Sequence, residues 1–257
     1  MKILSNEIAQ HYQIASLNRG HVVFTSFISR AGKILFLDPH IERLLRGASF
    51  LFPIFQWEIS HQKIKEYVLN IFKEDSSDAY FRLTIFDDCI YLQRKVLEFE
   101  SVELSLTSAI KIKTPGLIPA YLKLSNYLEA DLEVRQAKLN GFDDVVFFDW
   151  DGYVSEASTS NLFIVTMAGV IKTPPISPMV LAGITREQLI KNLPRMNLVV
   201  QVEPITKAEL EGAQEIWLTN SVKGIRFVSQ YEQNKFERKN SIFEKVTTFL
   251  GRFGELI

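Results

Sequence analysis

The first part of the chain shows a strand-like hydrophobic pattern. Residues 22–30 (VVFTSFISR) and 33–37 (KILFL) are short runs rich in β-branched and aromatic side chains, which favour strands. Gly32 lies between the two runs and can adopt the positive φ that a tight turn requires. The pattern therefore predicts a β-hairpin over this part of the chain.

The hydrophobic spacing then changes to that of a helix, with apolar positions continuing over residues 44–48. Asp38 is the predicted N-cap, because its carboxylate can accept from unpaired backbone N–H groups, and Pro39 then takes the first helical position. The helix is expected to begin near His40, a residue that by itself is typical of a cap or a surface. On spacing alone, Arg43 is interpreted as a solvated arginine on the flank of this helix.

A second helix and a second hairpin follow. Residues 60–75 place apolar side chains on one helical face, and residues 79–96 form two strand-like runs that are expected to turn at Asp87-Asp88. Residues 101–112 predict another strand.

Two prolines and a glycine interrupt the pattern at residues 114–120. Such a break is typical of a domain boundary. The sequence therefore predicts an N-terminal α/β domain over 1–113, a linker over 114–120 and a C-terminal α/β domain over 121–257.

The second half of the chain begins with a predicted helix over residues 126–141. Its apolar face is expected to include Leu128, Leu132 and Leu139, and Gly141 is its predicted C-terminal stop. Strands are predicted over 145–149, 153–157 and 161–166, the first two joined by a turn at Trp150-Asp151-Gly152.

Residues 170–193 predict a strand, a proline-rich loop and a helix that starts at Gly183-Ile184-Thr185. The unpaired N–H groups at a helix start attract anions, so this start is a candidate anion site. A later strand ends in a second polar cluster, Asn220-Ser221, and residues 241–253 predict a closing amphipathic helix.

The composition narrows the class of partner. A net charge of −1 gives no reason to expect nucleic acid or an anionic membrane, so a small molecule is the expected partner. Cys89 is the only cysteine, which excludes an internal disulfide, and it is interpreted as a small buried side chain. No apolar run reaches the roughly 18 residues of a membrane span, and the N-terminus does not resemble a signal peptide. These features predict a cytoplasmic protein.

Five motifs give the chain a chemical interpretation, although Lys123 or Glu156 alone would be interpreted as a surface residue. The motifs, in chain order, are HIERL from His40, KLSNYL from Lys123, VSEASTSNLF from Val154, GITRE from Gly183 and TNSVKGIR from Thr219. In this order and spacing they resemble the fold-type IV pyridoxal phosphate enzymes. This family contains branched-chain aminotransferases, D-amino acid aminotransferases and 4-amino-4-deoxychorismate lyases.

The resemblance implies a two-domain α/β fold with the cofactor, pyridoxal 5'-phosphate, in the cleft between the domains, and a homodimer. It implies that Lys123 forms the Schiff base with the cofactor and moves protons. Glu156 is expected to pair with the pyridine nitrogen. No metal belongs to the implied site. The implied phosphate ligands are Arg43, Ile184, Thr185, Asn220 and Ser221.

The reaction is less closely defined. Phe24-Thr25-Ser26 resembles the Phe-Thr-Thr of the deoxychorismate lyases, whereas D-amino acid aminotransferases carry Tyr-Glu there and branched-chain enzymes Phe-Glu-Gly. Asp87-Asp88 stands where many relatives have Arg-Gly, so an arginine that aminotransferases use for the substrate carboxylate is expected to be missing. The residues expected on the substrate side are Phe24, Ser26, Arg82 and Lys223.

The leading hypothesis is a lyase that releases pyruvate and p-aminobenzoate from an amino-bearing carboxylate substrate, for folate synthesis. The alternative is an aminotransferase for a small amino acid of the branched-chain or D-amino acid type. A cofactor-binding or regulatory subunit without catalysis is a third possibility. The presence of both Lys123 and Glu156 argues against it, since such a subunit has no chemical need for either.

Overall fold

The structure is a computed structural model that describes residues 2–3, 19–53, 60–86, 89–97, 103–238 and 241–248. By its internal contacts the chain divides into two compact units. The first contains residues 1–98 and 122–126, and the second contains most of the rest, beginning with 99–121. Lys123 thus belongs to the first unit, although it was expected in a C-terminal domain. The proposed linker at 114–120 stays a prediction.

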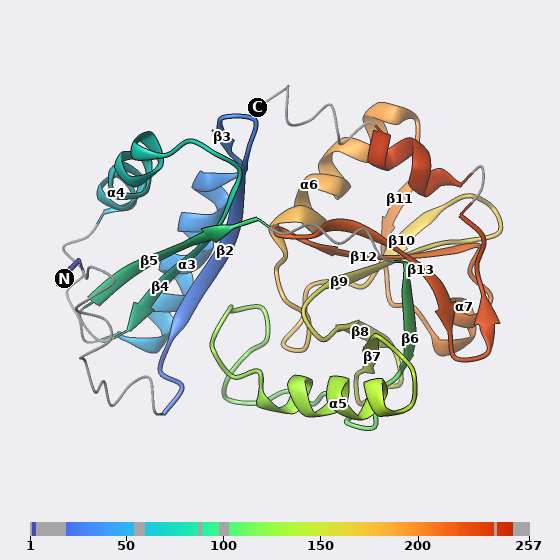
Figure 1. Cartoon of the computed structure of the whole chain (residues 1–257). Coiled ribbons are helices and arrows are strands. Elements are labelled where there is room, and N and C mark those ends of the chain that lie inside the picture. The colour runs from blue at the N-terminus through green and yellow to red at the C-terminus, as the bar shows by residue number, and fades with distance from the viewer. Residues whose placement is uncertain are drawn as a thin grey trace. The chain divides into compact units, whose positions relative to one another are not determined.

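The described residues of the first unit form a five-stranded sheet in the order β1-β5-β4-β2-β3 (Figure 1). β1 pairs with β5 in parallel, and the other neighbours are antiparallel. The hairpin of β2 and β3 and the pairing of β4 with β5 confirm the predicted strands, while the turn expected at 87–88 lies outside the described residues. The strands are β1 Lys2–Ile3, β2 Val23–Arg30, β3 Lys33–Ile34, β4 Ala79–Phe86 and β5 Cys89–Val96.

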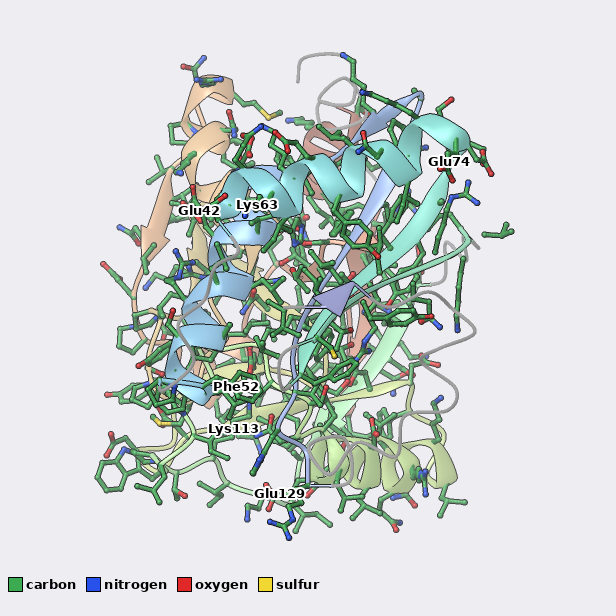
Figure 2. The ribbon with its side chains drawn as sticks, turned by 90° about the vertical axis from the view of Figure 1, so that its left-hand side faces the viewer. Glu42, Phe52, Lys63, Glu74, Lys113 and Glu129 are labelled. Carbon is green, nitrogen blue, oxygen red and sulfur yellow. The ribbon has the colours of Figure 1, made fainter. Side chains whose placement is uncertain are left out.

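Two helices belong to this sheet, α3 (Leu37–Leu51) and α4 (His61–Glu74). Alternate residues of β2, including Val23 and Phe27, pack with both helices in one apolar core. The first turns of α4, marked by Lys63 in Figure 2, lie beside the part of α3 that carries Glu42.

The N-cap predicted for α3 is wrong. The helix begins at Leu37, so Asp38 lies inside the first turn, and the N-cap position is Phe36 in the left-handed region (φ 54°). The Asp38 carboxylate instead accepts from Lys65 of α4 at 2.8 Å. Contact between the two helices therefore determines the position of Asp38.

The described residues of the second unit form a nine-stranded sheet in the order β11-β10-β9-β12-β13-β6-β7-β8, with β14 paired to β13. Its first strands are β6 Leu104–Ser108, β7 Asp144–Phe148, β8 Val154–Ala157 and β9 Asn161–Val165. The later strands are β10 Ile171–Thr173, β11 Val200–Val202, β12 Glu215–Asn220, β13 Gly224–Tyr231 and β14 Asn234–Lys235.

This second sheet separates two apolar cores. Leu162 and Ile164 of β9 enter one core, while Phe163 and Val165 enter the other, which packs against α6. α5 lies beside β7 (Figure 1). The helical elements are α5 Leu128–Leu139, α6 Ile184–Asn192, the 3₁₀ turn η1 Leu193–Met196, α7 Lys207–Glu211 and a helix over 242–248.

α5 has the predicted position but not the predicted buried face. Leu128, Leu132 and Leu139 are exposed, and Ala137 is the buried residue of the helix. None of the helices that the structure describes is long and apolar enough to span a membrane.

Candidate active site

Lys123 is fixed through its backbone to β2 in the first unit. The Phe24 N–H donates to the Lys123 carbonyl at 3.1 Å, and the Ser125 N–H donates to the Val22 carbonyl at 3.0 Å. The flanking Leu122 and Leu124 are buried in the helix-facing core. These contacts hold the segment on both sides of Lys123 and leave its side chain partly exposed.

An aromatic ring lies between two basic groups on the other face of β2. The Lys123 ammonium is 4.7 Å from the centroid of the Phe24 ring, and the guanidinium carbon of Arg82 is 3.6 Å from the same centroid. Both distances are in the range of cation–π contacts. Arg82 also donates to the Ser125 hydroxyl at 3.4 Å. This face carries positive charge, which is suited to a carboxylate substrate.

Ser26 lies on the same strand face as Phe24. Its hydroxyl is 3.1 Å from the Tyr80 hydroxyl, and Ser26 is the cross-strand partner of Arg82. Of the residues expected on the substrate side, the structure brings Phe24, Ser26 and Arg82 together. Lys223 belongs to the second unit, on an exposed turn. Tyr80 was not predicted, although its position two residues before Arg82 places it on the same face of β4.

The opposite face of β2 carries a buried polar cluster of Thr25, His40 and Arg43. Arg43 donates to the Thr25 hydroxyl at 3.0 Å, and that hydroxyl is 2.7 Å from His40 Nδ1. Thr25 and His40 are 0% exposed and Arg43 is 3% exposed. The interpretations of His40 as a surface or capping residue and of Arg43 as solvated are therefore wrong. Both side chains point from α3 toward the sheet.

Burial lowers the pKa of His40 well below its ordinary value of 6.5, and the positive charges of Arg43 and Lys123 lower it further. His40 is therefore neutral near pH 7. The Thr25 hydroxyl accepts from Arg43 and lies within hydrogen-bond distance of His40 Nδ1. Nε2 has no hydrogen-bond partner among the described residues.

Glu156 has well-defined partners in the second unit. It lies on β8 and is 8% exposed. Its Oε1 accepts from Lys113 at 2.7 Å, and its Oε2 accepts from the Leu181 N–H at 2.9 Å and from the Asn161 amide at 3.3 Å. The carboxylate is thus held in one orientation. Neither Lys113 nor Asn161 was predicted as a site residue. Asn161 stands in the VSEASTSNLF motif, whereas nothing in the sequence singles out Lys113.

The start of α6 is built closely around Asn161. A Cβ atom on Gly183, the N-cap of α6, would collide with the Asn161 side chain, so a larger residue here would displace the Asn161 amide. The Thr185 hydroxyl is 3.3 Å from the Ser221 hydroxyl. Two predicted phosphate ligands, far apart in sequence, therefore meet at the first turn of a helix, where an anion is stabilised.

The side chain of Asn220 makes hydrogen bonds that stabilise a turn. Its side-chain oxygen Oδ1 accepts from the N–H groups of Val222 (3.1 Å) and Lys223 (2.7 Å), and its side-chain Nδ2 donates to the Ser160 hydroxyl at 3.2 Å. These bonds shape the turn that presents Ser221.

The groups present fit pyridoxal phosphate. The first unit supplies an amine on a fixed segment and a buried guanidinium. The second unit supplies an oriented buried carboxylate and two hydroxyls at a helix start. An aldehyde, a ring nitrogen and a phosphate are the complementary groups of the cofactor.

Comparisons with known proteins agree with this chemistry. The model of the family described as amino-transferase class IV matches residues 22–231. The Escherichia coli branched-chain-amino-acid aminotransferase is 26% identical over 245 residues, which cover 84% of this chain and 77% of that protein. A candidate branched-chain-amino-acid aminotransferase of Aquifex aeolicus is 30% identical over 224 residues, covering 79% of this chain and 71% of the relative.

Solved structures show the same fold. A candidate 4-amino-4-deoxychorismate lyase from Legionella pneumophila has a TM-score of 0.86 at 25% identity, with 98% of each chain covered. A Brucella abortus aminotransferase solved with pyridoxal phosphate has a TM-score of 0.86 at 19% identity, covering 99% of this chain and 94% of that one. The chain is therefore a fold-type IV enzyme of the amino-transferase class IV family, whose cofactor is pyridoxal 5'-phosphate.

Proposed function

We propose that this enzyme is a lyase that converts 4-amino-4-deoxychorismate into pyruvate and p-aminobenzoate, a step of folate synthesis. The observation that carries the proposal is the Phe24-Thr25-Ser26 run of β2, which resembles the Phe-Thr-Thr of the deoxychorismate lyases. The family resemblance implies a glutamate at the place of Thr25 in aminotransferases, whereas here the Thr25 hydroxyl contacts Arg43 and His40. The likeness to the Legionella protein over 98% of both chains supports the same assignment.

In this proposal the site residues named above hold pyridoxal phosphate. Lys123 would bind the aldehyde carbon of the cofactor, and Glu156 would pair with the ring nitrogen of the cofactor. Asn220 contributes by holding the turn at Ser221, and Arg43 contributes a fixed positive charge. Bound pyridoxal phosphate supplies an electron-accepting ring beside the reacting carbon of the substrate. The phosphate ligands are Arg43, Ile184, Thr185, Asn220 and Ser221.

Lys123 is the proton-transfer group in this reaction. With pyridoxal phosphate bound, Lys123 would remove the proton from the ring carbon that bears the substrate amine. The C–O bond to the enolpyruvyl group would then break and the ring would become aromatic, and the proton held by Lys123 would pass to the departing enolate, which becomes pyruvate. Arg82 and Phe24 are proposed to receive a substrate carboxylate and the flat ring, since they present a cation and an aromatic face together. Ser26 and Lys223 are the remaining substrate-side proposals.

The second candidate is an aminotransferase for a small amino acid, which the curated relatives favour by their names. Lys123 would then move the α-carbon proton of an amino acid, and a keto acid would be needed as second substrate. The lyase and the aminotransferase would use the same cofactor ligands. They would differ in the substrate that is accepted by the β2 face carrying Phe24 and Ser26.

Two assays on the purified holoenzyme distinguish the candidates. The first follows pyruvate and p-aminobenzoate released from 4-amino-4-deoxychorismate without any keto acid. The second follows the visible spectrum of the bound cofactor with a panel of L- and D-amino acids. We expect stoichiometric release of both products in the first assay. Rapid spectral conversion by an amino acid, without pyruvate release, would instead identify an aminotransferase.

We also propose that the enzyme is a homodimer and that α5 contributes to the contact with a second copy. Leu128, Leu132 and Leu139 form one exposed apolar stripe along this helix. Acidic residues occupy its first half and basic residues its second half, so two antiparallel copies would match opposite charges. A cytoplasmic location remains a further prediction.

The oligomeric state of Leu132→Glu tests this contact, because a buried charge at the centre of the stripe would oppose association. We expect a dimeric wild type and a shift toward monomer in the variant, measured by light scattering after gel filtration. Met167→Glu, a change at another exposed apolar residue, is the control. A variant as dimeric as the wild type would exclude α5 from the contact.

A further inference from the structure

Lys113 is the ion-pair partner of Glu156 and lies in the second unit. Its N–H donates to the Phe148 carbonyl at 2.8 Å, which fixes the backbone at the end of β7. Its ammonium is 2.7 Å from Glu156 Oε1, 3.3 Å from the Met179 carbonyl and 5.0 Å from the centroid of the Phe147 ring. The ammonium is thus held by a carboxylate, a carbonyl and an aromatic face.

This pair is more enclosed than the neighbouring pair of Lys111 and Glu129. The side chains of Lys113 and Glu156 are only 23% and 11% exposed, whereas those of Lys111 and Glu129 are 51% and 71% exposed. Water screens an exposed pair almost completely, but a partly buried pair retains much of its Coulomb interaction. Lys113 therefore changes the electrostatic potential that Glu156 presents to its surroundings.

The other two donors to Glu156 are uncharged. The Leu181 N–H and the Asn161 amide orient the carboxylate but leave its net charge unchanged. The charges of Lys113 and Glu156 sum to zero, so a cation near the pair is stabilised less than it would be by Glu156 alone.

We propose that Lys113 is a positioning residue that weakens the negative field of Glu156 at the ring nitrogen of the cofactor. The inference rests on the proposed role of Glu156. The protonation of the ring nitrogen of the bound cofactor is therefore set by Lys113 and Glu156 together, and not by Glu156 alone.

The test is a pH titration of the ring nitrogen of the bound cofactor, followed by nitrogen NMR of holoenzyme that carries ring-labelled pyridoxal phosphate. Removing a nearby cation favours the protonated forms of neighbouring groups, so Lys113→Met is expected to move the midpoint upward by about one pH unit. Lys113→Arg keeps the charge and is expected to restore the wild-type midpoint. Lys113→Gln, which keeps a donor without charge, is expected to resemble Lys113→Met and replaces it if that variant does not fold.

Lys111→Met removes a charge from the exposed pair and serves as the matched control, with an unchanged midpoint expected. If Lys113 served only to hold the Met179 loop, its neutral variants would lower the melting temperature without moving the midpoint, and this result would overturn the inference. Wild-type protein that takes up no cofactor would overturn the proposed function as well. Normal uptake with an unmoved midpoint would overturn the inference alone.

Discussion

The two units present their site residues in different ways. In the first unit, the cationic groups of Lys123 and Arg82 both lie near the Phe24 ring, while burial on the opposite face of β2 keeps His40 neutral. In the second unit, Glu156 is enclosed by three donors, one of them the cation Lys113. Lys123 is thus held through its backbone, while Glu156 is held through its side chain.

The largest expected effect comes from the first unit. Lys123→Ala removes both the covalent attachment and the proton-transfer group, and activity should fall by about 10³-fold or more. The visible absorbance of the bound cofactor should disappear with it. Lys95→Ala, an exposed lysine of the same unit, is the control and should keep colour and rate. A coloured, active Lys123→Ala would refute the assignment of this lysine.

Glu156→Gln examines the second unit. The amide keeps the shape of the carboxylate but loses its charge, so the cofactor should remain bound while the rate falls by about 10²-fold. Cofactor content and kcat are measured on the same sample, with Glu129→Gln as the exposed control. An unchanged kcat would show that the charge of Glu156 is not needed.

Thr25→Val tests the buried cluster behind β2. Valine has nearly the same shape as threonine but leaves His40 Nδ1 and one Arg43 donor without the hydroxyl, so the free energy of unfolding should fall by about 1–3 kcal/mol. Cofactor affinity should fall as well, because Arg43 loses a bond that orients it. Thr25→Ser retains the hydroxyl and should lie close to the wild type in denaturant titrations. Equal losses in the two variants would indicate that packing, and not the hydroxyl, is responsible.

The smallest effect is a pH dependence of stability that comes from His40. Its pKa is depressed in the folded protein, so its contribution to stability is complete above pH 6.5, the unfolded value, and is lost as pH falls below it. The slope can reach about 1.4 kcal/mol per pH unit, because the unfolded chain binds a proton that the folded chain excludes. The free energy of unfolding is measured from pH 7 downward.

His40→Gln should flatten this slope, since glutamine does not titrate. The exposed His21 provides the matched control, and His21→Gln should leave the slope unchanged. A slope that is equal in the wild type and in His40→Gln would assign the acid sensitivity to other groups.

Local patterns predicted much of the secondary structure. β2, α4 and α5 lie where their residue spacing indicated, because strand and helix periodicities are properties of neighbouring residues. The same patterns were misleading where a residue has a distant partner. Asp38 pairs with α4 instead of capping α3, and the apolar side chains Leu128 and Leu132 of α5 are exposed.

In the candidate site, some residues were found through sequence motifs and others only through their contacts. The motifs led to five residues whose roles remain proposals: Lys123, Glu156, Arg43, Thr185 and Ser221. Lys113 and Tyr80 escaped prediction, because neither belongs to a motif and each is identified only by what it contacts.

The sequence by itself determined the family, the cofactor and the order of the elements, since these depend on motifs and periodicity that are written along the chain. Only the tertiary structure decided that Lys123 packs on β2 of the first unit, that Arg43 and His40 are buried around Thr25, and that Glu156 is paired with Lys113. The physical reason is that burial and charge pairing depend on segments that are distant in the chain and adjacent in space, and no local pattern encodes that distance.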